Sequence, residues 1–542
     1  MSKEHTTVTD SALDDCDLAY TPVKLIGGIV DELRTSFDGG TLREVSERKR
    51  HLQALLKGLR AEEKRLLAAV RNDLNKSEDE TYMYELSPVL FEIGLFLDKL
   101  DKWARPEGVN IAGEQPAFML SKAQIRREPL GTVLVIGAWN YPIRLALLPL
   151  VGAIAAGNTV VLKPSEGAPH AAAAVERLLT EYVDARVVRV VQGAVEEATE
   201  LLQHRFDHFF YTGNGTVGRV VARAAAEHLA GVTLELGGKS PAIVHADVAD
   251  LEPTAFRIMW AKLTNAGQTC VGVDYLLVHR SVKDRLIPLL ADAARGMFGA
   301  APQKSADYGR IINARHWTRL DDMLRASEGT PVAVVDDVAD EADRYIPPTI
   351  VDGVRGDDSL MRAEIFGPIL PIVTYDTLDE AIAFVNERDH PLALYVFASA
   401  ASAERVISRT RSGSASVNDT MFFMGSHATP FGGVGPSGVG SYTGKASLDT
   451  FSHHRHVLKR PMWFPSPGLD SMRAAPFSGR ENSWKARLCC ALSCPTARPL
   501  RQTLLAKLAT FIPFWRLLLA TPSFLWALFT AQPTIRRPTD SK

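Results

Sequence analysis

One cysteine, Cys270, lies in the polar stretch "KLTNAGQTCVG" at residues 262–272, and no other cysteine lies within 200 residues of it. A cysteine thiolate can attack a carbonyl carbon and form a covalent intermediate, so Cys270 is a candidate nucleophile. Free cysteine is also among the most buried residue types. The residue type alone therefore favours the alternative, a small side chain that fills a gap in the core.

The other cysteines indicate the compartment. They are Cys16, Cys489, Cys490 and Cys494. Together with Cys270 they make five, an odd number, and no C-x-x-C pair is present, so neither a disulfide framework nor a zinc site is favoured. The first 20 residues are polar and acidic, without the apolar run of a signal peptide. We expect the body of the protein to lie in the reducing cytosol.

Two further residues stand where polar side chains can act on a bound molecule. Glu235, in "TLELGGKSP", lies between two leucines, where burial would disfavour its charged form, as suits a general base. The alternative is a glutamate on the solvent face of an edge strand. Asn140, in "GAWNYP", follows a predicted strand; its amide can donate to an oxyanion or cap the helix that begins near Ile143.

A glycine motif, "GNGTVG", places Gly213, Gly215 and Gly218 in G-x-G-x-x-G spacing between a predicted strand and a helix. Such a motif can hold a dinucleotide phosphate at a helix N-terminus. It follows the fourth strand rather than the first, so a tight turn that needs glycine is equally compatible. Lys163 and Glu166, in "VVLKPSE", end another strand and can bind ribose hydroxyls or form a solvated turn.

Alternating elements must position these residues. Short β-branched runs begin at 131, 158, 186 and 208, and segments rich in Ala and Leu separate them. This alternation predicts right-handed βαβ units and a parallel sheet covered on both faces. The runs "SPAIVH", "YLLVHR" and "LPIVTY" predict a second α/β region from about 236 to 425. Near the start, Leu52, Leu55, Leu56 and Leu59 predict one apolar helix face.

Charge is unevenly distributed along the 542 residues. Residues 461–542 hold eleven basic and three acidic side chains, so this tail carries +8 and the rest −10, which disfavours a nucleic-acid-binding body. Within the tail, 508–531 contains one charge, Arg516, and is long enough to span a bilayer. Arg516, Pro513 and Pro522 equally suit a helix that lies in the interface. A packed helix of the globular body is the third alternative.

Seven motifs occur in one order along the chain: "GAWNYP", "LKPSE", "FFYTGNGTVGR", "TLELGGKSP", "NAGQTC", "EIFGPILPI" and "PFGGVGPSG". Together they resemble the motifs of the aldehyde dehydrogenase superfamily, and "YTGNGTVGR" and "TFSHHR" are closest to its class 3, fatty aldehyde branch. The resemblance covers about residues 25–460 and implies an α/β fold with a Rossmann-type cofactor domain, an α/β catalytic domain and a small β bridging arm. "FSHHRH" falls within the pattern, so we expect it to be structural and expect no metal site.

The resemblance also divides the chain. We expect a flexible acidic arm at 1–24, a dinucleotide-binding domain at 25–108 and 132–235, a catalytic domain at 236–425, a bridging arm at 109–131 and 426–460, a basic linker at 461–507, a membrane-associating segment at 508–531 and a basic end at 532–542. In the family the bridging arm builds a dimer, which implies a homodimer. We expect the protein to face the cytoplasm and to be attached to a membrane through its C-terminus.

By position, the resemblance implies that Cys270 is the nucleophile, Asn140 the oxyanion donor and Glu235 the base that activates water. It implies NAD or NADP as cofactor, with Glu364 on the nicotinamide ribose and Phe366 beside it. The other cofactor contacts that it implies are Lys163 and Glu166 near the adenosine ribose, and Gly213 and Gly218 near the pyrophosphate.

These roles predict oxidation of aldehydes to carboxylic acids through a thiohemiacetal and a thioester. The apolar tail favours medium- to long-chain aliphatic or lipid-derived aldehydes. One alternative is an acylating dehydrogenase that passes the thioester to coenzyme A, although such enzymes generally lack the glutamate that matches Glu235. The other is a catalytically inactive membrane-associated scaffold, which the set Asn140, Glu235, Cys270 and Glu364 disfavours.

Overall fold

The computed structural model describes residues 18–111 and 121–460, which form two compact units. The first unit comprises the described residues up to Ala104 together with Glu128–His453. The second comprises the described parts of Arg105–Arg127 and of the chain from His454 onward. The predicted segments at 461–507, 508–531 and 532–542, and most of the predicted arm at 1–24, lie outside the described residues.

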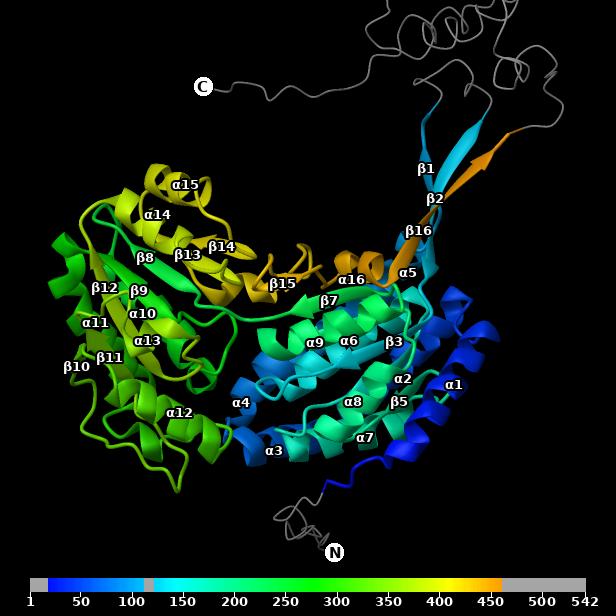
Figure 1. Ribbon diagram of the computed structural model, residues 1–542, viewed down its shortest axis with the longest axis horizontal. Helices are drawn as coiled ribbons and strands as arrows, with labels where there is room; N and C mark the ends of the chain where they lie inside the picture. Colours follow the sequence, from blue (N-terminus) through cyan, green and yellow to red (C-terminus); the bar gives the residue numbers. More distant parts are fainter. Residues whose placement is uncertain (1–17, 112–120, 461–542) are drawn as a thin grey trace, which may run out of the picture. The chain divides into compact units, whose positions relative to one another are not determined.

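The first unit contains a six-stranded sheet in the order β15-β7-β6-β3-β4-β5 (Figure 1). Its strands are β3 (Thr132–Ile136), β4 (Thr159–Lys163), β5 (Val188–Val190), β6 (His208–Thr212), β7 (Gly231–Glu235) and β15 (Gly438–Val439). Neighbours are parallel except β15, which runs antiparallel to β7. The four predicted strands correspond to β3, β4, β5 and β6.

Helices pack on both faces of this sheet. Val133 of β3 lies in one apolar core with Ile143, whereas Leu134 lies in another with Ile26, because successive strand residues point to opposite faces. The helices of this part are α1 (Val23–Asp38), α2 (Val45–Ala61), α3 (Glu63–Leu74), α4 (Glu78–Thr81), the π-helix η1 (Tyr82–Leu86), α5 (Ser87–Trp103), α6 (Pro142–Ala156), α7 (Pro169–Tyr182), α8 (Val195–Gln203) and α9 (Gly215–Glu227). The apolar face predicted near the start is confirmed on α2, where Leu52 and Leu55 are fully buried.

A second sheet of the same unit has seven strands in the order β10-β11-β12-β9-β8-β13-β14. They are β8 (Pro241–Val244), β9 (Tyr275–His279), β10 (Thr330–Val332), β11 (Thr349–Asp352), β12 (Ile369–Tyr375), β13 (Ala393–Phe397) and β14 (Ser414–Val417). Only β10 is antiparallel to its neighbour. The remaining helices along the chain are α10 (Leu251–Leu263), η3 (Thr264–Gly267), α11 (Arg280–Phe298), η4 (Pro302–Lys304), α12 (Ala314–Arg325), α13 (Ser359–Arg362), α14 (Leu378–Asn386), α15 (Ala400–Ile407), η5 (Met421–Gly425) and α16 (Lys445–Thr450). Of these, α16 packs on α6, beside the first sheet.

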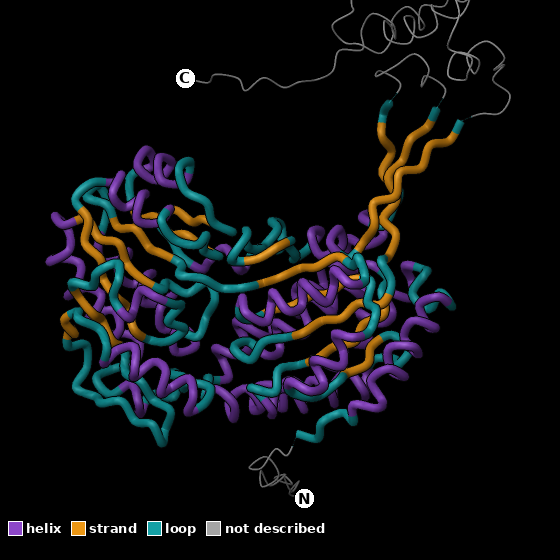
Figure 2. The backbone as a smooth tube through the Cα atoms, viewed as in Figure 1, coloured by secondary structure: helices purple, strands orange, loops and turns teal. Residues whose placement is uncertain are grey.

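The second unit contains a three-stranded sheet of β1 (Glu107–Val109), β2 (Lys122–Pro129) and β16 (Ser452–Lys459), drawn in orange in Figure 2. The predicted arm segment 426–460 is therefore divided, since only β16 joins this sheet. Its glycine-rich part instead pairs with β7: a Cβ atom on Gly438 would lie 2.4 Å from the carbonyl oxygen of Leu234, so this approach requires glycine.

The described ranges contain neither a membrane-spanning helix nor a cluster of metal ligands. Within residues 18–111 and 121–460, no helix combines the length and the apolar character needed to cross a membrane. The same ranges contain no group of three or more His, Cys, Asp or Glu side chains arranged to hold a metal ion. "FSHHRH" lies at the end of α16 and in β16, where His453 and His454 are exposed.

Candidate active site

The loop before Cys270 has a backbone conformation that few sequences tolerate. Asn265, Ala266 and Gly267 take φ values of +54°, +49° and +77° in succession, all in the left-handed region. A Cβ atom on Gly267 would lie 2.2 Å from the carbonyl oxygen of Gly367, so this position requires glycine. Such strain persists only where the surroundings hold it, which is typical of functional sites.

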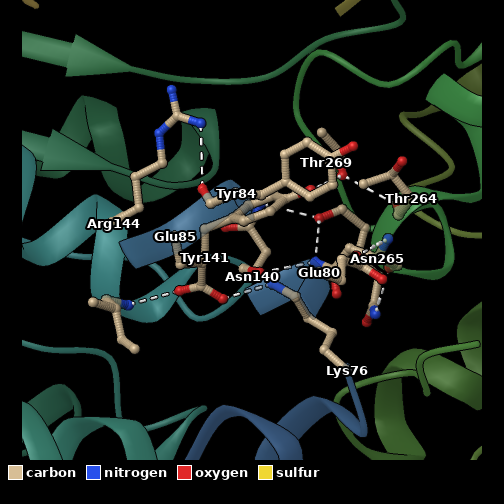
Figure 3. Close-up of polar contacts among 12 residues, drawn as sticks. Lys76, Glu80, Tyr84, Glu85, Asn140, Tyr141, Arg144, Thr264, Asn265 and Thr269 are labelled. Carbon is tan, nitrogen blue, oxygen red and sulfur yellow. Dashed lines mark hydrogen bonds and ion pairs between the residues drawn. The ribbon is translucent and has the colours of Figure 1, made fainter. Parts of the chain in front are cut away.

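Asn140 lies in the turn between β3 and α6 and is buried. Its Nδ2 donates to the carbonyl oxygen of Gln268 at 3.1 Å, and its own carbonyl oxygen accepts from Nδ2 of Asn265 at 2.8 Å (Figure 3). Two asparagines thus join this turn to the Cys270 loop. The capping interpretation of Asn140 is wrong, because the N-cap of α6 is Tyr141 and the Asn140 amide donates to Gln268 instead.

Cys270 is half-buried, unlike the fully buried side chains of the surrounding core. Burial, and then the negative charges of Glu364 and Glu235, raise the pKa of its thiol to about 12, while the Arg144 guanidinium opposes this rise. The thiol is therefore protonated at neutral pH in the protein alone. Because the thiolate is the nucleophile, attack requires a proton acceptor close to the sulfur.

Glu235 ends β7 and is buried, with 3% of its surface exposed. Burial raises the pKa of its carboxyl group well above the usual range. Neither carboxyl oxygen accepts a hydrogen bond from any residue in the described part of the chain. The interpretation of Glu235 as a glutamate on the solvent face is wrong, since β7 is also covered by β15 through the Glu235–Gly438 pair.

Glu364 approaches the same centre from the turn before β12. A Cβ atom on Gly237 would lie 2.4 Å from a carboxylate oxygen of Glu364, so this carboxylate rests on the loop that follows Glu235. Burial, and then the charge of Asp274, raise its pKa to about 8, while the backbone N–H of Gly238 lowers it. Two carboxyl groups with raised pKa values therefore act on the Cys270 thiol, and the negative charge of each raises its pKa.

Three more of the predicted cofactor contacts lie in the turn before β12 and at the end of β4. Phe366, which has a φ of +54°, packs edge-on against Trp139 with ring centroids 5.4 Å apart, next to Asn140. At the end of β4, Nζ of the buried Lys163 lies 2.9 Å from Oε2 of Glu166, whose side chain is 40% exposed. The ion pair contradicts the interpretation of Lys163 as part of a solvated turn.

Two glycines of the predicted phosphate motif, Gly213 and Gly218, have a packing reason to be glycine. A Cβ atom on Gly213 would lie 2.2 Å from the hydroxyl oxygen of Tyr211, and one on Gly218 would lie 2.8 Å from a methyl carbon of Leu236. Gly213 also donates its N–H to the carbonyl oxygen of Glu235. These contacts hold the turn before α9 against the end of β7 at Glu235.

The carboxyl edge of the six-stranded sheet fits a dinucleotide. Parallel α/β sheets bind such ligands at this edge. Here β4 ends in Lys163, the turn after β6 leads to the N-terminus of α9, and the buried hydroxyl of Thr212 has no hydrogen-bond partner among the described residues. The chemistry of this edge, a cation with a helix N-terminus for phosphate and carboxylates for ribose hydroxyls, suits NAD or NADP.

Arg144 is a residue that the sequence motifs do not single out. Its guanidinium donates to the carbonyl oxygens of Tyr84 at 3.4 Å and Met424 at 3.2 Å (the first is drawn in Figure 3), and its charge lowers the pKa of the Cys270 thiol. A signal was present, because Arg144 is the one charged residue of "PIRLALLPLVGAIAA". A charge in an apolar helix is rarely buried without a specific reason.

Comparison with known proteins agrees with this geometry. The sequence model of the "Aldehyde dehydrogenase family" matches residues 24–457. The chain is 44% identical over 458 residues to "Aldehyde dehydrogenase family 3 member A2" of Rattus norvegicus, covering 84% of this chain and 92% of that protein. It is 44% identical over 438 residues to "Aldehyde dehydrogenase, dimeric NADP-preferring" of Canis lupus familiaris, covering 81% and 95%.

A solved structure extends the agreement to three dimensions. "Substrate bound state of Staphylococcus Aureus AldH" matches with a TM-score of 0.81 and 40% identity, covering 85% of this chain and 99% of that chain. Class 3 proteins are thus among the relatives, and the expected Rossmann-type and catalytic α/β architecture is confirmed. The chain therefore belongs to the aldehyde dehydrogenase family, whose members oxidise aldehydes with NAD or NADP.

Proposed function

We propose that the protein oxidises medium- to long-chain aliphatic or lipid-derived aldehydes to carboxylic acids, with Cys270 as nucleophile. The observation that carries the proposal is a single buried centre: Asn140 is bonded to the Cys270 loop, and the charge of Glu235 acts on the Cys270 thiol. The apolar run at 508–531, outside the described residues, supports a hydrophobic substrate that partitions into bilayers.

The first half of the reaction builds the thioester. Glu235, an unbonded carboxylate when ionised, takes the thiol proton of Cys270, and the sulfur attacks the aldehyde carbon. The carbonyl electrons move to oxygen, which accepts hydrogen bonds from Nδ2 of Asn140 and from the backbone N–H of Cys270. A dinucleotide held at the carboxyl edge of the sheet would supply the oxidation as a hydride acceptor, so that the oxyanion collapses to the thioester as the hydride leaves the aldehyde carbon.

The second half hydrolyses the thioester. Once Glu235 has passed its first proton to solvent, it takes a proton from a water molecule that attacks the thioester carbon. The carbon–sulfur bond breaks, the acid leaves, and the Cys270 thiolate is restored. The presence of Glu235 favours hydrolysis over transfer to coenzyme A.

Six residues would hold the dinucleotide. We propose ribose contacts for Lys163, Glu166 and Glu364, a nicotinamide-side contact for Phe366, and close backbone approach of the pyrophosphate at Gly213 and Gly218. The exposed carboxylate of Glu166 should repel the additional 2′-phosphate of NADP. The relative from Canis lupus familiaris is described as NADP-preferring, so both cofactors belong in the assay.

One activity panel tests the substrate and the alternatives. Purified full-length protein is assayed with saturated aldehydes of increasing chain length, with NAD and with NADP, with and without coenzyme A. We expect kcat/KM to rise toward longer chains and the free acid to form without coenzyme A. A steady fall from short to long chains would refute the substrate class. Product that appears only as the coenzyme A thioester would establish the acylating alternative, and no NAD(P)H from any aldehyde the scaffold.

We also propose attachment to a membrane through 508–531, with the protein facing the cytoplasm. The support is the single charge in 24 residues within a tail of net +8. Cell fractionation of the full chain against a chain ending at residue 504 tests this. The full chain should sediment with membranes and the shortened chain should stay in the supernatant. Equal distribution of both would contradict the proposal.

We propose, finally, that the protein forms a homodimer. One relative is described as dimeric, and the three-stranded sheet of β1, β2 and β16 contains the arm segments through which the family resemblance implies a dimer. Light scattering during size-exclusion chromatography of the detergent-solubilised chain should give a mass of two copies. A monomer mass across micromolar concentrations would refute it.

A further inference from the structure

A buried ion pair lies behind the active-site turn. Nζ of Lys76 and Oε1 of Glu85 are 2.6 Å apart, and neither side chain exposes any surface (Figure 3). Lys76 follows α3, and Glu85 lies in the π-helix η1, a distortion that is frequent at functional sites. The attraction within a buried pair seldom exceeds its desolvation cost, so its retention here needs a reason besides stability.

Glu85 binds the turn that carries Asn140. Its second carboxylate oxygen, Oε2, accepts from the backbone N–H of Ile143 at 2.9 Å. Pro142 has no N–H, so Ile143 provides an early free donor of α6. A negative charge at this helix end is also favourable for the helix dipole. The carboxylate of Glu85 therefore fixes the start of α6, three residues after Asn140.

Lys76 acts on the residue beside Asn140. Its Nζ lies 4.2 Å from the ring centroid of Tyr141, a cation–π contact. The hydroxyl of Tyr141 is 2.7 Å from the hydroxyl of Thr269, which precedes Cys270 in the chain. The buried pair thus contacts both halves of the site. Glu85 bonds to Ile143, close to Asn140, and Lys76 contacts Tyr141, whose hydroxyl bonds to the residue before Cys270.

We propose that Lys76 and Glu85 are positioning residues that hold Asn140 at the distance from Cys270 at which its amide stabilises the oxyanion. The inference rests on the proposed role of Asn140 and extends it to residues outside every catalytic motif. Lys76 and Glu85 act through the backbone of α6 and the ring of Tyr141 rather than on the aldehyde. A displacement of about 1 Å in such a donor can lower the rate about a hundredfold.

Four variants test the coupling: Lys76→Met, Glu85→Gln, Asn140→Ala and the double variant Glu85→Gln/Asn140→Ala. With saturating cofactor, we expect Lys76→Met and Glu85→Gln to lower kcat about 10- to 100-fold with KM for the aldehyde changed less than about threefold. Asn140→Ala should lower kcat about 100- to 1,000-fold. In the Asn140→Ala background, Glu85→Gln should change kcat less than about twofold, because the group that it positions is gone.

A further double variant shows whether a loss of activity comes from misfolding or from lost positioning. Lys76→Met/Glu85→Gln leaves no unpaired buried charge, and it should fold but still lose about tenfold in kcat because the contact with Tyr141 is lost. The matched control is Glu92→Gln, since Glu92 is equally buried and accepts from the backbone N–H of Gly444 at 2.7 Å. This control should lower the melting temperature but keep kcat within about twofold.

The outcomes distinguish the positioning role of Lys76 and Glu85 from the proposed role of Asn140. A Glu85→Gln variant with normal kcat, beside an impaired Asn140→Ala variant, overturns the positioning role alone. Equal losses from Glu85→Gln in both backgrounds also overturn it, because a merely structural effect is independent of Asn140. An Asn140→Ala variant with normal kcat overturns both the positioning role and the proposed function of Asn140.

Discussion

The two sides of the active site are held in opposite ways. On the nucleophile side, the fully buried Gln268 donates to the carbonyl oxygens of Asn265 and Arg310 and accepts from the N–H of Ile312. On the other side, Glu235 accepts no hydrogen bond from any described residue.

The difference fits the roles that we propose for Cys270 as nucleophile and Glu235 as base. A nucleophile works from one position, so its loop gains from every bond that prevents movement. A base that takes two protons in one cycle must change its charge, and hydrogen bonds to the charged form would hold it ionised and weaken it as a base. Position is therefore fixed at Cys270, whereas charge is left adjustable at Glu235.

The largest effect is expected from a substitution of the proposed nucleophile, Cys270, on the side that is fixed by hydrogen bonds. Cys270→Ser should lower kcat by at least about a thousandfold, because a serine hydroxyl is far less acidic than a thiol that is already difficult to ionise here. The measurement is NAD(P)H formation at saturating aldehyde. Cofactor binding and the melting temperature should stay near those of the unaltered protein. Full activity of this variant would overturn the mechanism.

The adjustable side is tested next by Glu235→Gln. We expect kcat to fall about 10²- to 10⁴-fold, because glutamine cannot take a proton from water. Rapid-mixing measurements should also show the loss of any NAD(P)H burst, because Glu235 takes the thiol proton before the aldehyde is attacked. A burst that is kept before slow turnover would restrict Glu235 to hydrolysis of the thioester.

The pH dependence of kcat in the unaltered protein and in Glu235→Gln tests the adjustable charge of Glu235 directly. A base acts when ionised, and burial raises the pKa of Glu235, so kcat should rise with pH through a value above the usual range of a glutamate. Glu235→Gln should remove that rise. A profile in which both proteins keep the same rise would assign it to another group.

A smaller effect comes from the strained loop. A Cβ atom on Gly267 would lie 2.2 Å from the Gly367 carbonyl oxygen, so Gly267→Ala should lower kcat about 10- to 100-fold and destabilise the fold by about 2 kcal/mol. The matched control is Gly94→Ala within α5, where nothing lies within 4 Å and alanine should stabilise by about 0.5–1 kcal/mol. Equal behaviour of the two variants in activity and denaturant unfolding would contradict the strain argument.

The smallest effect concerns a carboxylate that, unlike Glu235, is paired. Glu166→Gln should raise kcat/KM for NADP relative to NAD about three- to tenfold, because a partly exposed charge that repels the 2′-phosphate is removed. Initial rates with both cofactors measure it. An unchanged ratio would show that Glu166 does not discriminate between them.

Much of this site was predictable from sequence because its chemistry depends on residue type. Glu235 between two leucines indicated burial, which the structure confirms with 3% exposure. The β-branched runs gave the strands directly, since parallel strands buried on both faces are apolar throughout. The family resemblance named Asn140 and Cys270, and the structure joins their loops through Gln268.

Other parts depend on contacts that no local pattern encodes. Lys76 and Glu85 lie more than 50 residues before Asn140 and read as surface charges in a polar helical region. The division of 426–460 between two sheets depends on backbone approach at Gly438, and its glycines alone do not say which strand they meet. Arg144 could have been noticed as a charge in an apolar helix, but its partners Tyr84 and Met424 come from distant segments and could not be predicted.

The two-residue strand β15 has a consequence for how the enzyme is made. Gly438 and Val439 cover Glu235 and Leu234, residues that are synthesised about 200 positions earlier. We expect the edge of β7 at Glu235 to stay open until nearly all of the described chain has been translated, so a chain that ends before β15 would contain Cys270 but lack the strand that covers the proposed base.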